Sequence, residues 1–421
     1  MRGQLAIMMG LLYAVQGAWF PLLAVHLKDL GISGEARGWI FATFALGSLA
    51  APIGAGQLAD RRVAADRLMS IIFALAAVFL GVMASGATAG AGPIFLLFFI
   101  YWVIVAPASG LSNTIALRNL DQPRAQFGGV RLWGTIGWMV AGWIVAQTMA
   151  LTGSDDGPEG ASEGFAVGAI LAVVLAIFCL KLPRTPPLAS SGSGWGWAEA
   201  ATDARMLLRK PIVGLYFVTA FGVTLTLPYM FQVQPPYLES IGLPRRWLAP
   251  AMTLGQLPEI AALWGLPWML RRFGDRGTLA IGIAAWVVRY GSLALDPPLW
   301  LALAGIPLHG IGIACFSIAG QMFLDGQAPP HRRAGAQGLH TVITAGLGAL
   351  LGNLLAGAVV GQSGDTAVVF FVPFAVNVVL LLTWVGLAKR ASRRSQPLPE
   401  PPPPALRDNQ VLVSEPLRSS E

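Results

Sequence analysis

The sequence predicts an all-α integral membrane protein with twelve transmembrane helices in two six-helix bundles. Of its 421 residues, 55% are hydrophobic and only 12% are charged, whereas about a quarter of the residues of a soluble domain are charged. Apolar runs of the length that crosses a bilayer, about 17–25 residues, recur along the chain. A stretch rich in Pro, Ser and Gly near the middle separates six of these runs from six more.

The runs follow one another with short loops between them. The first six cover 4–26, 38–59, 67–88, 92–117, 127–150 and 164–182, and the second six cover 211–234, 247–270, 278–295, 299–324, 335–361 and 366–388. The first run is too long for a signal-peptide core, so we expect a retained helix. The halves therefore predict bundles at 1–182 and 211–388, a cytoplasmic linker at 183–210 and a disordered cytoplasmic tail at 389–421.

The basic residues predict the orientation of the chain. Most of the 28 Lys and Arg residues fall in loops on one side, and the side enriched in them is the cytoplasmic one. We therefore expect both termini in the cytoplasm. We also expect a monomer in the lipid bilayer of a cell inner membrane. The net charge of +7 is dispersed among short loops, so nucleic acid is not an expected partner. The two cysteines lack the spacing of a metal site, and we expect no metal and no cofactor.

Arg131 lies inside the apolar run at 127–150, where a charge is expensive and marks a functional site by default. Thr135 and Trp138 follow at i+4 and i+7, so a helix presents all three side chains on one face. A cation, a hydroxyl and an aromatic plane would then line one cavity wall and contact a substrate. The alternative is an arginine that snorkels to the interface near a helix end.

Glu259 is the one acidic residue that the predicted spans place near the middle of the membrane. A buried carboxyl close to an arginine is suited to taking up and releasing a proton, so we assign proton coupling to Glu259 and Arg131. Gln256, about one turn earlier, shares its face and offers both a donor and an acceptor to a substrate. A structural ion pair that holds the bundles together is the alternative.

Two loop motifs suggest a superfamily. The sequence GQLADRR at 56–62 resembles the first half of the signature loop of the major facilitator superfamily, and RRFGDRG at 271–277 stands at the corresponding place in the second half. The resemblance implies a fold of two six-helix repeats. It also implies a conformational latch at Asp60, Arg61 and Arg62, whose ionic contacts break when the bundles rock.

Within that superfamily the chain resembles the nucleoside:proton symporter family. The matching passages are LSNTIALRNL, VRLWGTIGW, GQLPEIAALWGLPWMLRRFG, IAAWVVRYG and RRAGAQG. The resemblance implies proton-coupled nucleoside uptake by alternating access, with Arg131, Gln256 and Glu259 facing a central cavity. It also puts substrate contacts of the seventh and tenth spans at Thr226, Tyr229 and His309. The family's substrate-binding aspartate is replaced here by Ala314, which leaves the identity of the solute open.

Other interpretations remain open from sequence. A permease for another polar cyclic solute, such as a sugar or an aromatic acid, is one, and a membrane receptor that transports nothing is another. An enzyme is not expected, because the chain has no HExxH motif and no Ser/His/Asp constellation. Arg289, near the end of the ninth run, is expected to snorkel. Further cavity candidates are Tyr13, Gln16, Trp19 and Asn113.

Overall fold

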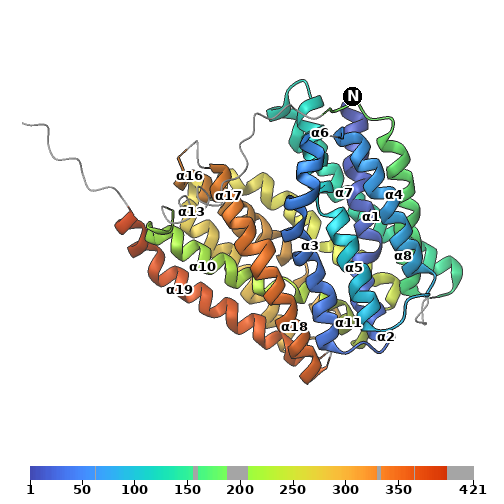
Figure 1. The fold of residues 1–421 in the computed structure, drawn as a ribbon. Helices are drawn as coiled ribbons and strands as arrows, with labels where there is room; N and C mark the ends of the chain where they lie inside the picture. The colour runs from blue at the N-terminus through green and yellow to red at the C-terminus, as the bar shows by residue number, and fades with distance from the viewer. Residues whose placement is uncertain (62, 155–159, 187–206, 330–332, 365, 396–421) are drawn as a thin grey trace, which may run out of the picture.

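The computed structural model describes residues 1–61, 63–154, 160–186, 207–329, 333–364 and 366–395. Over these residues the chain is helical and contains no strand. Figure 1 shows the two halves of the chain as two bundles side by side, the first coloured blue to green and the second green to red. The predicted fold class, an all-α membrane protein of two bundles, is confirmed.

The first bundle is built from the helices that precede the linker. They are α1 (Arg2–Trp19), α2 (Leu23–Asp29), α3 (Gly34–Arg61), α4 (Ala65–Ala84), α5 (Ala91–Val105), α6 (Ala108–Asn119), α7 (Pro123–Thr152) and α8 (Gly160–Cys179). Helix α1 packs against α7 and α8, and α4 packs against α8. A tryptophan in α1, Trp19, fills the centre of this bundle against Phe98, Tyr101 and Phe165.

The second bundle has more broken helices. Its elements are α10 (Pro211–Thr226), a π-helical turn (Tyr229–Val233), α11 (Gln234–Ser240), α12 (Leu248–Met252), α13 (Gln256–Ala294), α14 (Leu299–Gly305), α15 (Leu308–Gly312), a π-helical turn (Ile313–Ile318), α16 (Ala319–Gln327), α17 (Arg333–Thr341), a π-helical turn (Val342–Gly348), α18 (Ala349–Ser363) and α19 (Phe371–Ser395). Short 3-10 turns at Phe20–Leu22, Arg245–Trp247, Thr253–Gly255 and Ala367–Phe370 complete the described elements.

The twelve predicted spans coincide largely with helical residues, although the third and sixth spans extend a few residues past the ends of α4 at Ala84 and α8 at Cys179. The eighth and ninth spans form one long element, α13, in which only Gly274 leaves helical geometry, at φ 66°. Glycine tolerates that left-handed conformation, so RRFGDRG makes a sharp kink where the sequence suggested a loop. Helix α19 continues to Ser395, so residues 389–395 are helical and the expectation that the disordered tail begins at 389 is corrected. Most of the linker and the tail lie outside the described residues.

Proline explains several of the helix breaks near the cavity. Pro21, Pro107, Pro228 and Pro307 each stand at a point where one helical segment ends and another begins. Proline lacks the N–H that an α-helix needs and its ring clashes with the preceding turn, so a long apolar run bends at each of these residues. The bends bring short segments, such as Leu227–Phe231, to the centre of the molecule.

The bundles meet at the end of the molecule away from the N-terminus, where Figure 1 places α2, α11 and α18. Helices α3 and α18 touch there through glycines: a Cβ added to Gly357 would lie 2.6 Å from the carbonyl oxygen of Gly34. Beside them the guanidinium of Arg245 pairs with Asp29 of the other bundle at 2.8 Å and with Glu239 at 2.7 Å. We name these contacts the closed end. Figure 1 shows the bundles apart at the other end, near α6 and α17.

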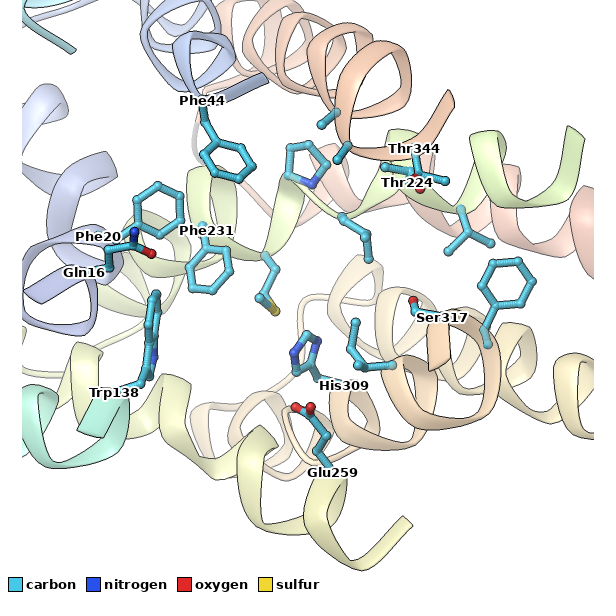
Figure 2. Close-up of a pocket in the computed structure, with 18 of the residues that line it drawn as sticks. Gln16, Phe20, Phe44, Trp138, Thr224, Phe231, Glu259, His309, Ser317 and Thr344 are labelled. Carbon is cyan, nitrogen blue, oxygen red and sulfur yellow. The ribbon is translucent and has the colours of Figure 1, made fainter. Parts of the chain in front are cut away.

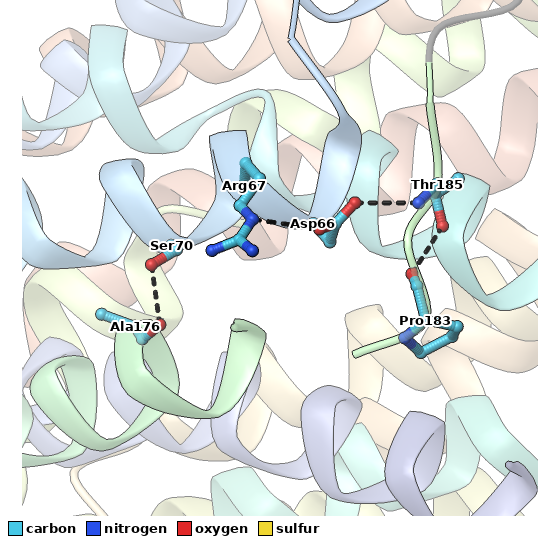
Figure 3. A network of polar contacts seen from close by, with 6 residues as sticks. All are labelled: Asp66, Arg67, Ser70, Ala176, Pro183 and Thr185. Carbon is cyan, nitrogen blue, oxygen red and sulfur yellow. Dashed lines mark hydrogen bonds and ion pairs between the residues drawn. The ribbon is translucent and has the colours of Figure 1, made fainter. Parts of the chain in front are cut away.

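Both described ends of the linker are attached to their own bundle. Figure 3 shows the carboxylate of Asp66, at the start of α4, accepting a hydrogen bond from the backbone N–H of Thr185 at 2.8 Å. The side-chain amide of Asn119 donates to the Thr185 hydroxyl at 2.9 Å. On the second bundle, the ammonium of Lys210 donates to the carbonyl of Gln327 at 2.8 Å.

Candidate functional site

A cavity of about 540 Å³ lies between the two bundles. Helices α1, α3, α5 and α7 supply one wall, and α10, α13, α15 to α18 and the three π-helical turns supply the other. Its volume falls in the usual range of small-molecule sites. The polar residues that line it are Tyr13, Gln16, Arg131, Thr135, Thr224, Gln256, Glu259, His309, Ser317, Gln321, His340, Thr344 and Asn353.

The cavity has an end that is mainly aromatic, where Gln16 also lies, and an opposite end that carries hydroxyl groups. Figure 2 shows Phe20, Phe44, Trp138 and Phe231 gathered on one side. The rings of Phe20 and Phe231 pack edge to face with centroids 5.0 Å apart, and Trp138 lies 6.0 Å from Phe231, so residues of both bundles form one aromatic cluster. On the opposite side, the figure shows the hydroxyls of Thr224, Ser317 and Thr344.

Arg131 lies half-buried in the cavity wall, together with Thr135 and Trp138 as their spacing predicts. Its guanidinium sits 4.2 Å from the centre of the Tyr13 ring, a distance typical of a cation–π contact. Its position on the wall rules out the alternative that it snorkels to the interface. Gly134 makes room for this arrangement, because a Cβ there would lie 2.8 Å from the guanidinium and 2.7 Å from the Tyr13 ring.

Glu259 and Gln256 also line the cavity, from the first turns of α13. Arg131 and Glu259 line the same cavity, but no ion pair within 4.0 Å joins the two among the described residues. The alternative of a direct structural pair between the bundles therefore does not hold in this conformation. Both groups are open to a substrate that would sit between them.

His309 stands beside Glu259 in the same wall, as Figure 2 shows. Its imidazole is buried and packs edge to face on the ring of Trp286, with centroids 5.4 Å apart. The next residue, Gly310, touches the backbone of Glu259 so closely that no Cβ would fit between α15 and α13. The small residue after the proline-induced break thus sets the imidazole next to the carboxylate.

Thr226 and Tyr229 do not line the cavity, so their expected position is corrected. The Thr226 hydroxyl donates to the carbonyl of Val223 at 2.7 Å and accepts from Asn377 at 3.0 Å, deep inside the second bundle. Tyr229 is fully buried against Tyr290. The cavity face of this segment follows helical spacing through Val223, Thr224, Leu227, Pro228 and Phe231. The two expected positions fall between these and face away.

Arg289 does not snorkel, which is a second correction. It is 0% exposed and lies inside the second bundle, where it donates to the side-chain oxygen of Gln234 and to the carbonyl of Ile306. Its guanidinium also faces the ring of Trp286 at 5.6 Å. Because Trp286 in turn supports His309, the arginine ties three helical segments together behind the cavity wall.

Of the remaining residues that the sequence suggested for the cavity, some line it and others do not. Tyr13 and Gln16 line the cavity, whereas Trp19 packs inside the first bundle and Asn113 is exposed outside the cavity. Asp60 and Arg61 are the last two residues of helix α3. Arg62 lies outside the described residues, so the latch stays a prediction. Ala314 is fully buried and its neighbours Ile313, Phe316 and Ser317 line the cavity in its place.

Sequence reasoning did not single out Thr224, Ser317, Gln321, His340, Thr344 and Asn353, nor the phenylalanines of the aromatic end. The polar residues recur at helical spacing within apolar runs, as at Ser317 and Gln321, and that spacing was an available signal. The phenylalanines carry no such signal, because aromatic side chains face lipid as readily as a cavity.

Comparison with known proteins agrees with this geometry. A model of the family described as nucleoside H+ symporter matches residues 1–390. The chain is 31% identical to the putative nucleoside transporter YegT of Escherichia coli K12, over 84% of this chain and 83% of that protein. It is 26% identical to the nucleoside permease NupG of the same organism, over 92% of this chain and 95% of that protein.

The same likeness appears in three dimensions. A crystal structure of the nucleoside transporter NupG superimposes with a TM-score of 0.79 and 25% identity, covering 92% of this chain and 99% of that one. The sequence match, the shared fold and a cavity between two bundles all lead to one conclusion. The chain belongs to the nucleoside H+ symporter family, and it is a transporter rather than an enzyme.

Proposed function

We propose that this chain carries nucleosides together with protons through the central cavity, by alternating access between its two bundles. The observation that carries the proposal is the position of Glu259. It is the one carboxylate among the described residues that line the cavity, and it shares the cavity with Arg131 and with an aromatic cluster. A titratable group in the membrane beside a substrate-sized space supports proton coupling.

The two ends of the cavity fit the two parts of a nucleoside. The flat aromatic base would lie at the aromatic end, between Phe20, Trp138 and Phe231, where ring stacking is favourable. The sugar would then reach Gln256, His309 and the hydroxyls of the opposite side, which donate and accept hydrogen bonds. This placement assigns substrate binding to Arg131, Thr135, Trp138, Gln256, Glu259 and His309.

Coupling would follow from the protonation state of Glu259. When the carboxylate is ionised, Arg131 balances its charge. When the carboxylate is protonated, the pair carries a net positive charge, and the oxygen atoms of a bound nucleoside would accept hydrogen bonds from the guanidinium. A change in net charge alters the relative stability of the two conformations, since each solvates the cavity differently. Proton release and substrate release would therefore occur on the same side.

The orientation belongs to this proposal too. With the basic loops in the cytoplasm, both termini are cytoplasmic and the closed end faces outward, so the described conformation is open toward the cell interior. The bundles at 1–182 and 211–388 would rock about the cavity, with 183–210 as linker. We place the protein in the inner membrane as a monomer.

Uptake into energised vesicles tests the proposal. Wild-type protein in vesicles that are more alkaline inside should accumulate labelled uridine, and dissipating the pH gradient should abolish accumulation. Glu259→Gln should lose accumulation while it keeps exchange of internal for external uridine, because the amide retains the shape of the side chain. Asp121→Asn, at an exposed carboxylate outside the cavity, is the matched control. Accumulation by Glu259→Gln at the wild-type level would remove Glu259 from the coupling mechanism.

A further inference from the structure

A second pocket of about 510 Å³ lies beside the central cavity, between α16 and α17 of the second bundle. Gln321 and His340 line both spaces, so the two pockets share a wall. The second pocket is otherwise lined by Ile318, Met322, Asp325, Gln337 and Thr341. Its carboxylate, two amides, imidazole and hydroxyl give it a polar character in a mostly apolar bundle.

The polar groups of this pocket are held in place by their neighbours. The Gln337 amide donates to a carboxylate oxygen of Asp325 at 2.8 Å and to the backbone carbonyl of Gln321 at 3.0 Å, which joins α17 to α16. The ring of His340 stacks on Tyr216 with centroids 5.8 Å apart and planes 12° apart. A ligand therefore meets a site that is already ordered, which lowers the entropic cost of binding.

The chemistry of the pocket suits a polyhydroxylated ring. A carboxylate has two oxygens and about four acceptor positions, so the bond from Gln337 leaves Asp325 able to accept from a pair of neighbouring hydroxyls. Hydrogen bonds to an ionised acceptor are the stronger kind. The described lining of the central cavity offers no carboxylate besides Glu259. Asp325 thus adds a carboxylate outside that cavity.

The pocket lies toward the open end of the molecule. Figure 1 places α16 and α17 at the end where the bundles are apart, away from the closed end at α2, α11 and α18. A solute that leaves the central cavity in this direction passes the wall formed by Gln321 and His340.

We propose that this pocket is a second nucleoside site on the route out of the central cavity, in which Asp325 binds the ribose hydroxyls. The proposal rests on the proposed function, since it takes the transported solute to be a nucleoside. It predicts that recognition of ribose hydroxyls differs between the two faces of the membrane, because the pocket is reached from the open end.

The test compares the two faces. The external nucleoside concentration that gives half-maximal exchange is measured without a pH gradient, in right-side-out and in inside-out vesicles. It is measured for uridine and for 2′,3′-dideoxyuridine. In the wild type, loss of the hydroxyls should raise the half-saturation concentration more at the cytoplasmic face than at the outer face. Asp325→Asn should raise the half-saturation concentration for uridine about tenfold at the cytoplasmic face, as expected for lost hydrogen bonds to a charged group. It should leave dideoxyuridine and the outer face unchanged.

Controls separate recognition from packing. Asp121→Asn, at an exposed carboxylate outside the pocket, should behave as wild type. Gln337→Met breaks the tie between α16 and α17 but keeps the Asp325 carboxylate, so it should retain discrimination between the two nucleosides. If Asp325→Asn shifts both nucleosides alike, the residue acts through packing and the second site is refuted.

The outcomes also distinguish the two proposals. A wild type that exchanges uridine normally, with equal discrimination at both faces, overturns the second site and leaves the transport function standing. A wild type that exchanges no nucleoside at either face overturns both. Since the wild-type comparison needs no variant, the result does not depend on how well Asp325→Asn folds.

Discussion

Replacing Gly357 by alanine should destabilise the closed end. The added Cβ would lie 2.6 Å from the carbonyl oxygen of Gly34 and 2.7 Å from the Cα of Gly38, all backbone atoms that cannot rotate away. Carbon atoms pack comfortably only at about 3.5–4.0 Å, so α3 and α18 must separate by nearly an ångström. Forcing an extra group into a well-packed contact costs about 1–3 kcal/mol.

That cost falls on one conformation only, because α3 and α18 must part when the closed end opens. With about 1.4 kcal/mol for each factor of ten, the population should shift toward the outward-open state by about 5- to 150-fold. A shift of this size is measurable by chemical accessibility of the cavity.

Thiol labelling measures the shift. Thr344→Cys places a reactive group in the cavity wall, and the two native cysteines are buried. A membrane-impermeant thiol reagent added outside should label Thr344→Cys faster when Gly357→Ala is also present. Gly386→Ala is the matched control, because a Cβ at that helical glycine has nothing within 4 Å. Unchanged labelling with Gly357→Ala, or an equal change with Gly386→Ala, would refute the assignment of this glycine contact as a gate.

Four further outcomes are expected. Arg131→Ala should weaken uridine binding about tenfold or more, since it removes a charged donor, whereas Arg131→Lys should recover part of the loss in an equilibrium binding assay. Arg245→Gln leaves Asp29 and Glu239 facing each other without their cation, so external labelling of Thr344→Cys should rise, and no rise would show that this ion pair does not hold the end closed. Ser317→Asp should change selectivity among purine and pyrimidine nucleosides. Ala314→Asp should instead lower the yield of folded protein, because position 314 is 0% exposed. Equal yields of the two variants would contradict this. Asp60→Asn should slow conformational exchange and spare substrate affinity, and a collapse of affinity with normal exchange would exclude a latch.

Spacing within a helix predicted much of the cavity wall. Arg131, Thr135 and Trp138 fall on one face because they lie four and three residues apart, and Gln256 and Glu259 because they lie three apart. The rarity of charge in the spans drew attention to Arg131 and Glu259. These inferences need only the local geometry of one helix, which the sequence largely determines.

Tertiary packing decided the rest. Thr226 and Tyr229 were placed by resemblance to relatives, whereas the face defined by Thr224 and Phe231 depends on how the helix bends at Pro228. Arg289 resembled an interfacial arginine because nothing in its own run shows that Gln234, from another helix, accepts its hydrogen bond. A partner distant in sequence leaves no mark on local periodicity.

The attachments of Thr185 and Lys210 also bear on how the chain could be divided. Asp66 holds the linker's first described end on the first bundle, and Gln327 holds its second end on the second. Each end of the linker therefore stays attached to its own bundle whether or not a peptide bond joins the two halves. Two separately synthesised polypeptides, severed within 187–206, should assemble in the membrane into a working carrier. The intervening segment would then serve to keep the partners at equal number and high local concentration.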